Sequence, residues 1–174
     1  MALDVLKAAV VFFVAVVVQV AIVSAFEPGG GTADLVLVSL TAVALLRGSV
    51  FGAVAGFYAG FLLDTANLGT LGLSSLLLTL IGYWIGRYGE TTGRDRAHAP
   101  LLAIAVVTVL YALGSLGMNY LLGEPVSARA GLVDALPVQI VLNLLLTIPV
   151  YALCRRLFAR PGARPAIDVE FGTN

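Results

Sequence analysis

Charged residues are scarce in this chain. Of its 174 residues, 10 are Lys or Arg and 10 are Asp or Glu, whereas 60% are hydrophobic and the mean hydropathy is +1.01. A soluble domain of this size needs a larger polar surface than these charges can cover. The composition therefore excludes a soluble globular protein and indicates a membrane protein. We expect membrane lipids among its partners and no nucleic acid.

Cysteine and histidine each occur only once, as Cys154 and His98. A single cysteine excludes an internal disulfide, and one thiol is far short of a metal cluster. His98 lies in a charged loop, where a solvated side chain is the expected state. The P-loop, HExxH and GxSxG motifs are also absent from the sequence. We therefore expect no catalytic residue, no metal and no cofactor, and a protein that is not an enzyme.

Long apolar runs predict an all-α polytopic membrane protein with about six transmembrane helices. A helix needs about 20 apolar residues to cross a bilayer. Turn residues and charges separate the predicted spans, which are residues 5–26, 34–48, 49–63, 71–86, 101–122 and 132–158. The first apolar run is longer than that of a cleavable signal peptide, so we expect this span to be retained. The spans form one transmembrane domain over residues 1–160, and a flexible cytoplasmic tail is expected over residues 161–174.

The second and third predicted spans are short, at about 14–15 residues each. At 1.5 Å per residue, each covers only about 21–23 Å of a hydrocarbon core that is about 30 Å thick. Either polar ends extend these helices, or the pair is partly re-entrant and buried by the rest of the protein. A re-entrant pair in place of two crossings leaves the side of every later loop unchanged.

The distribution of cations predicts the orientation. With the N-terminus in the cytoplasm, only Arg129 falls outside, and nine of the ten cations fall inside. This is the positive-inside pattern, and the inverted topology would reverse it. Both termini are therefore expected in the cytoplasm. The nine cytoplasmic cations are Lys7, Arg47, Arg87, Arg94, Arg96, Arg155, Arg156, Arg160 and Arg164.

Small residues recur every four positions in the third span. The row consists of Gly48, Gly52, Gly56 and Gly60, and Asp64 follows four residues later. Residues at this spacing share one face of a helix, so the row forms a groove without side chains. In lipid, such grooves let two helix backbones approach closely. The groove serves either internal packing against another span or docking of a partner's transmembrane helix, and the two can coexist on different faces.

Two carboxylates lie at the outer ends of predicted helices. Asp34 begins the second span, where a carboxylate caps free N–H groups and suits the positive end of the helix dipole. Asp64 ends the third span, where the dipole is unfavourable, so an interfacial hydrogen bond or a partner contact must hold it. Asp34 is interpreted as a helix cap, with a partner contact as the alternative. A catalytic pair would need a third group, and none is present.

Several polar side chains lie deeper in the predicted spans. Gln19 belongs to the first span, and Gln139, Asn143 and Thr147 form a stripe with a spacing of four on the sixth. Polar side chains inside a membrane commonly form hydrogen bonds between helices, worth roughly 0.6 kcal/mol each. The alternative is a polar cavity for a small ligand. No charged residue joins the stripe, which favours the first interpretation.

Motifs in the first half of the chain resemble the MreD family of rod-shape-determining membrane proteins. They are A-D-L-V-L-V over residues 33–38, R-G over 47–48, G-A-V-A-G-F-Y-A-G-F-L-L-D over 52–64, L-G over 71–72 and G-Y-W-I-G-R over 82–87. Gln19 falls where the family often carries a glutamine. The sequence departs from the family pattern at Ala33, where proline is usual, and at Phe61, where leucine is commoner.

The resemblance implies a non-catalytic scaffold of the cell-wall elongation complex in the bacterial cytoplasmic membrane, involved in cell shape and peptidoglycan synthesis. The implied partners are a single-span MreC-like protein, the MreB filament and a glycosyltransferase–transpeptidase pair, bound directly or indirectly. The row from Gly48 to Gly60 and the ends at Asp34 and Asp64 are the implied contacts for the MreC transmembrane helix.

The implied fold is similar to the six-helix substrate-binding components of energy-coupling-factor transporters. A vitamin-binding component of such a transporter is therefore the alternative function. It would require a polar cavity open to the outside, lined by residues such as Asn119, Gln139 and Asn143.

Overall fold

Six α-helices form all the regular structure of the described residues in a computed structural model of the chain. The structure describes residues 2–21, 32–68, 71–92, 99–123 and 134–158. The helices are α1 (Ala2–Ala21), α2 (Leu35–Arg47), α3 (Ser49–Ala66), α4 (Leu73–Thr92), α5 (Ala99–Leu121) and α6 (Leu136–Phe158). The prediction of an all-α protein with six helices is confirmed.

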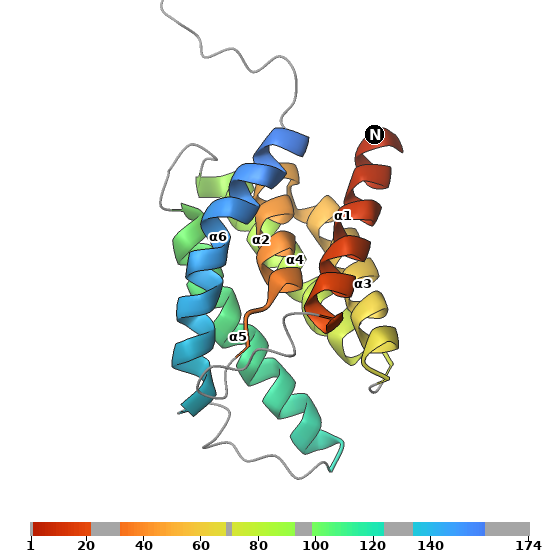
Figure 1. The fold of residues 1–174 in the computed structure, drawn as a ribbon, viewed down its shortest axis with the longest axis vertical. Helices are drawn as coiled ribbons and strands as arrows, with labels where there is room; N and C mark the ends of the chain where they lie inside the picture. The colour runs from red at the N-terminus through yellow and green to blue at the C-terminus, as the bar shows by residue number, and fades with distance from the viewer. Residues whose placement is uncertain (1, 22–31, 69–70, 93–98, 124–133, 159–174) are drawn as a thin grey trace, which may run out of the picture.

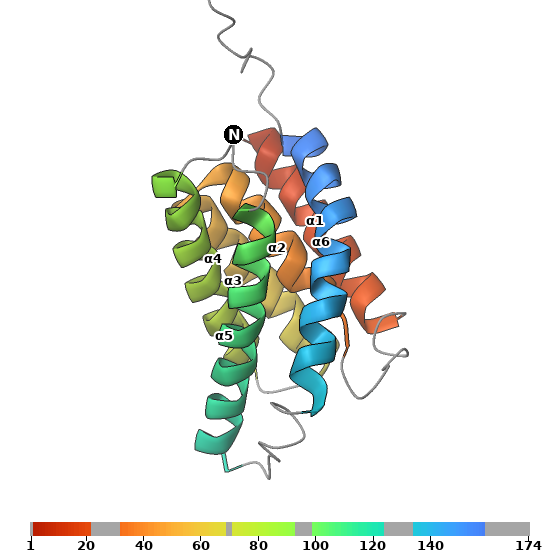
Figure 2. The same cartoon turned by 90° about the vertical axis from the view of Figure 1, so that its left-hand side faces the viewer.

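Successive helices run in alternating directions. As a result, α1 begins and α6 ends at the same end of the bundle (Figures 1 and 2). Lys7, Arg47, Arg87, Arg155 and Arg156 all belong to helix segments at this end. The positive-inside rule predicts that it faces the cytoplasm, and we call it the cytoplasmic end. The other five cations, His98 and the predicted tail lie outside the described residues.

The helices differ in how far they can cross a membrane. Four of them, α1, α3, α5 and α6, are long and apolar enough to span it. As predicted, α2 is short: its 13 residues rise only about 20 Å. The third span, in contrast, is not short. It continues for 18 residues to Ala66, because Asp64 hydrogen-bonds to the start of α4 and so does not end its own helix.

The short helix α2 forms the core of the bundle. It contacts each of the other five helices, and every residue from Val36 to Leu45 is buried. Large apolar side chains on the other helices face outward, among them Val54 and Leu145. In a membrane protein such residues contact lipid, so an apolar exterior around a buried central helix is the expected arrangement.

A single residue, Gly48, connects α2 to α3. Its φ of 96° lies in the left-handed region, which other residues rarely adopt. A Cβ atom at this position would also overlap the side chain of Glu90. The positive φ therefore favours glycine here, and the one-residue connection lets the chain reverse between α2 and α3.

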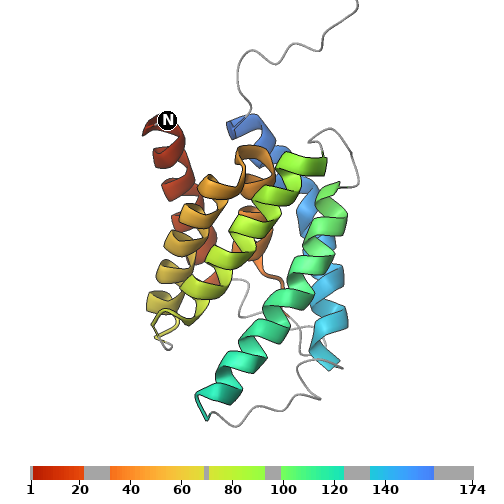
Figure 3. The same ribbon diagram turned by 180° about the vertical axis from the view of Figure 1, so that it is seen from behind.

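The row of small residues on α3 packs against α4, and the two helices run side by side (Figure 3). A Cβ atom at Gly52 would overlap the backbone of Gly82, and one at Gly56 would overlap the carbonyl of Leu78. Gly60 lies in the same way against the backbone of Ser75. Every four residues forward along α3 therefore correspond to three or four residues backward along the antiparallel helix α4. This face of α3 is an internal contact, so a partner helix on α3 would have to use another face.

We predict that Gly56→Leu destabilises the protein by about 3 kcal/mol or more, because its side chain would have to occupy the space of the Leu78 backbone. Thermal or denaturant unfolding in detergent micelles measures this loss. Val54→Leu is the control, because Val54 is 64% exposed on the same helix. Equal unfolding midpoints for the two variants would show that the α3–α4 contact is not as close as described.

Candidate functional site

The helix α2 begins inside the bundle. In Figure 1 the ribbon of α2 starts well above the lower ends of α5 and α6, and Asp34, which precedes the helix, is only 5% exposed. The first four N–H groups of a helix have no partner within that helix. Inside a membrane there is no water to bind them, so side chains must do so.

Three side chains accept hydrogen bonds from the four free N–H groups at the start of α2, which belong to the cap residue Asp34 and to the first three helical residues. Asp34 caps the helix by accepting a hydrogen bond from the N–H of Leu37 at 2.9 Å. Gln19 of α1 accepts from the N–H groups of the first two helical residues with its Oε1 atom, at 2.6 and 3.3 Å. Asn143 of α6 accepts from the N–H of Asp34 at 2.7 Å. The start of α2 is therefore tied to α1 and to α6.

A fourth helix joins these contacts through Asn143. The amide nitrogen of Asn143 donates to the hydroxyl of Thr108 on α5 at 3.0 Å, and both residues have no exposed surface. Thr147, the next member of the polar stripe on α6, donates to the backbone carbonyl of Asn143. We call Gln19, Asp34, Thr108 and Asn143 the α2 cap network, which joins α1, α2, α5 and α6.

The proposed ligand-binding role of the polar stripe finds no support in these contacts. Asn143 is fully buried and uses both ends of its side chain within the network. Gln139 and Asn119 are half-buried, and neither side chain hydrogen-bonds to another residue of the described part. Thr108 was not singled out from the sequence, because a lone threonine in an apolar span carries no local signal of its role.

The helices α3 and α4 cap each other. Asp64, in the last turn of α3, accepts hydrogen bonds from the N–H groups of Gly72 and Ser74 at the start of α4, at 2.8 and 3.1 Å. At the other end of the pair, Glu90 of α4 accepts from the N–H of Ser49, the first residue of α3, at 2.8 Å. A carboxylate at a helix start is favourable for the dipole. Asp64 is therefore held by an interfacial hydrogen bond.

Arg47 lies at the cytoplasmic end, where α2 ends. It forms an ion pair with Asp4 of α1, and its guanidinium lies over the rings of Phe51 and Phe158, 5.8 and 5.6 Å from their centroids. Nearby, Lys7 donates to the carbonyl of Leu157 at the end of α6. A cation suits the negative end of a helix dipole. These contacts fasten α1, α2 and α6 together at this end.

A cavity of about 630 Å³ lies between α1 and α3, next to Arg47. Small residues such as Ala8, Ala9 and Ala55 line it together with Val50 and Val54, and the Asp4–Arg47 pair lies at its cytoplasmic end. The cavity is largely apolar, which suits another apolar chain rather than a polar substrate. Within the described residues, no three acidic, thiol or imidazole side chains lie close enough together to hold a metal ion.

We predict that Asp34→Ala lowers the free energy of unfolding by about 1 kcal/mol, since it removes the cap of α2. Asp34→Asn is the matched control, because asparagine keeps a side-chain oxygen that can accept from the same N–H. Thermal unfolding in detergent compares the two. An alanine variant as stable as the wild type would disprove the capping role.

The link between α5 and α6 makes a separate prediction. Asn143→Leu and Thr108→Val each leave a buried polar partner without a hydrogen bond, which costs about 1–3 kcal/mol. Because the two side chains bond to each other, the double variant should lose less stability than the sum of the two single losses, by at least about 0.5 kcal/mol. Strict additivity in this double-mutant cycle would mean that the two residues act independently.

Comparison with known proteins agrees with this architecture. The family model described as rod shape-determining protein MreD matches residues 2–157, which is nearly the whole chain. No curated protein and no solved structure matches the chain. The similarity to transporter substrate-binding components therefore stays a prediction from the resemblance. The match, together with the helices that can span a membrane, shows that the chain is an integral membrane protein of the cell-shape machinery and belongs to the MreD family.

Proposed function

We propose that this protein is a non-catalytic scaffold of the cell-wall elongation complex in the bacterial cytoplasmic membrane. Membership of the MreD family supports a role in determining rod shape. The buried polar residues of the described part also support a structural role. Asp34, Asp64, Gln19 and Asn143 all hydrogen-bond to backbone N–H groups at helix starts, so their chemistry is already used in holding the fold.

The cavity between α1 and α3 is the proposed docking site for the transmembrane helix of a single-span MreC-like protein. The glycine row of α3, which the sequence also offers for this contact, is already packed against α4. The α1–α3 cavity has the same kind of surface: alanines at its base let another helix backbone approach, and the larger Val50 and Val54 form its rim. Small residues at helix contacts are what membrane helices use to associate in lipid.

Arg47 indicates how a partner helix would be oriented in the α1–α3 cavity. Its Nε atom is buried and has no hydrogen-bond partner among the described residues, while Asp4 and two aromatic rings hold the rest of the guanidinium. A polar group at the cytoplasmic end of a partner helix would complete this set of contacts. The MreB filament and the glycosyltransferase–transpeptidase pair would join the assembly at its two sides, directly or through the single-span partner.

The test is affinity purification of the tagged protein from its native membrane in mild detergent, followed by mass spectrometry. We expect Val54→Trp, which fills the cavity, to reduce recovery of a single-span coiled-coil protein about tenfold, the equivalent of about 1.4 kcal/mol. Val106→Trp is the matched control, since Val106 is similarly exposed but lies on α5.

The possible outcomes distinguish an error in the docking site from an error in the proposed scaffold function. If both variants keep the partner, the scaffold role stands but the partner docks elsewhere. If the wild type recovers no cell-wall proteins, and instead recovers ATPase subunits with a coupling membrane protein, the protein is a transporter component and the proposal is wrong.

A further inference from the structure

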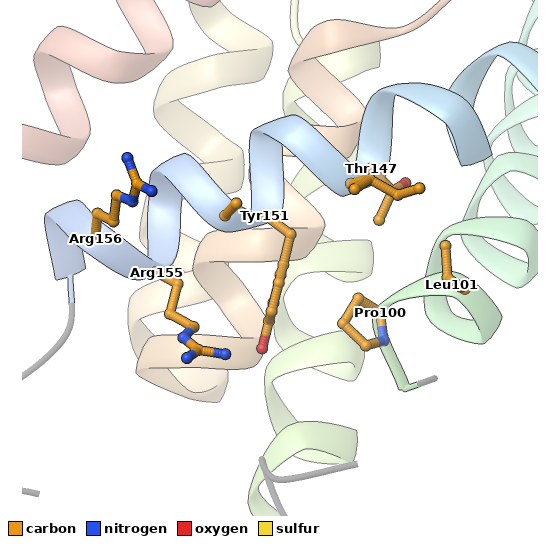
Figure 4. A pocket seen from close by; sticks show the side chains of 8 residues that line it. Pro100, Leu101, Thr147, Tyr151, Arg155 and Arg156 are labelled. Carbon is orange, nitrogen blue, oxygen red and sulfur yellow. The ribbon is translucent and has the colours of Figure 1, made fainter. Parts of the chain in front are cut away.

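A second cavity, of about 440 Å³, lies between the start of α5 and the end of α6 at the cytoplasmic end. Figure 4 shows it from close by. Pro100 and Leu101 approach from the start of α5, and the side chains of Thr147, Tyr151, Arg155 and Arg156 extend from α6. The cavity is separate from the α1–α3 cavity, with which it shares no residue.

The α6 side of this cavity has a polarity gradient. Its residues form two rows with a spacing of four, which places them on one face of the helix: Thr147, Tyr151 and Arg155, and beside them Ile148, Ala152 and Arg156. The arginines lie within one turn of the end of α6. From Arg155 down to Thr147 the helix descends eight residues, which is about 12 Å. The cavity is therefore basic at the membrane surface and largely apolar below it.

The two arginines are available for a ligand. Both side chains are exposed, and neither forms an ion pair with another residue of the described part. Other cations at this end are engaged: Arg47 pairs with Asp4, and Arg87 pairs with Glu90. In Figure 4, Arg155 extends to the same side of α6 as Tyr151, along the wall of the cavity, whereas Arg156 extends to the other side.

We propose that this cavity binds an anionic phospholipid of the cytoplasmic leaflet, with the headgroup phosphate on Arg155 and an acyl chain along Leu101 and Ile148. A guanidinium binds phosphate through two parallel N–H groups, which makes arginine well suited to this contact. Basic pockets between membrane helices on the cytoplasmic side bind acidic lipid headgroups for the same reason. The apolar lower wall distinguishes a lipid from a free phosphate ion, which would gain nothing from it. This inference does not depend on which protein partners the chain has.

Native mass spectrometry of the purified protein in detergent tests the proposal, with added phosphatidylglycerol or phosphatidylcholine. We expect phosphatidylglycerol to bind more tightly than phosphatidylcholine. Arg155→Gln should weaken phosphatidylglycerol binding roughly tenfold, which corresponds to about 1.4 kcal/mol. Ala152→Phe should weaken it as well, because the larger side chain occupies the cavity while both arginines remain.

The matched control is Arg87→Gln, which removes one positive charge from the same end of the protein but outside the cavity. It should change the affinity less than about twofold, because Arg87 already has an acidic partner and does not line the cavity. An equal loss in Arg87→Gln and Arg155→Gln would mean general attraction to a basic surface, and would overturn the proposal. So would unchanged binding in Ala152→Phe, whether or not Arg155→Gln can be purified.

Inorganic phosphate tests whether the site binds the phosphate of a lipid headgroup or a free phosphate ion. At millimolar concentration it should neither displace phosphatidylglycerol nor raise the thermal midpoint of the protein. If it does both, the site binds a soluble anion and the lipid assignment is wrong.

Discussion

The fold depends on how the N–H groups at the start of a buried helix are satisfied. Because α2 begins inside the bundle, its first four N–H groups would be left without partners in a medium that contains no water. Gln19, Asp34 and Asn143 bind them all, and each comes from a different segment of the chain. The same hydrogen bonds that permit a short central helix therefore also fix where α1 and α6 lie around it. This explains how 13 residues can form the core of a bundle whose other helices are longer.

The α3–α4 pair meets a different constraint. Lipid is as apolar as the side chains, so helix association gains little from hydrophobic burial and depends on close backbone contact and polar bonds. The glycine row supplies the contact along α3 from its start to Gly60. Asp64 and Glu90 close the pair at its two ends, because each caps the helix to which its own helix is packed. The two features reinforce each other, since the reciprocal caps hold the register in which the glycines of α3 face the backbone of Gly82, Leu78 and Ser75 on α4.

Sequence patterns reveal faces and ends of helices but not which neighbour they meet. The spacing of four identified the glycine row and the polar stripe, and Asp34 was recognised as a candidate cap because it precedes an apolar run. The neighbour of the glycine row could have been suspected, since Gly82 and Gly86 repeat the same spacing on α4. Glu90 and Thr108 could not, because their partners lie 41 and 35 residues away and arise only when the helices pack. The predicted boundary at residue 63 was wrong for the same reason: Asp64 ends the apolar run of the sequence, but its hydrogen bonds to the start of α4 satisfy it inside α3.

The last turn of α6 lies between the two cavities, and its contacts determine whether they act independently. On one side it carries Arg155 and Arg156, which line the α5–α6 cavity. On the other, Phe158 packs against Arg47, a residue of the α1–α3 cavity, and Leu157 accepts a hydrogen bond from Lys7. Packed helices shift between discrete arrangements rather than deform gradually. We therefore expect a ligand in one cavity to affect the other only if these contacts break. While they hold, the proposed partner site and the proposed lipid site are separate surfaces of the protein, because the two cavities share no residue.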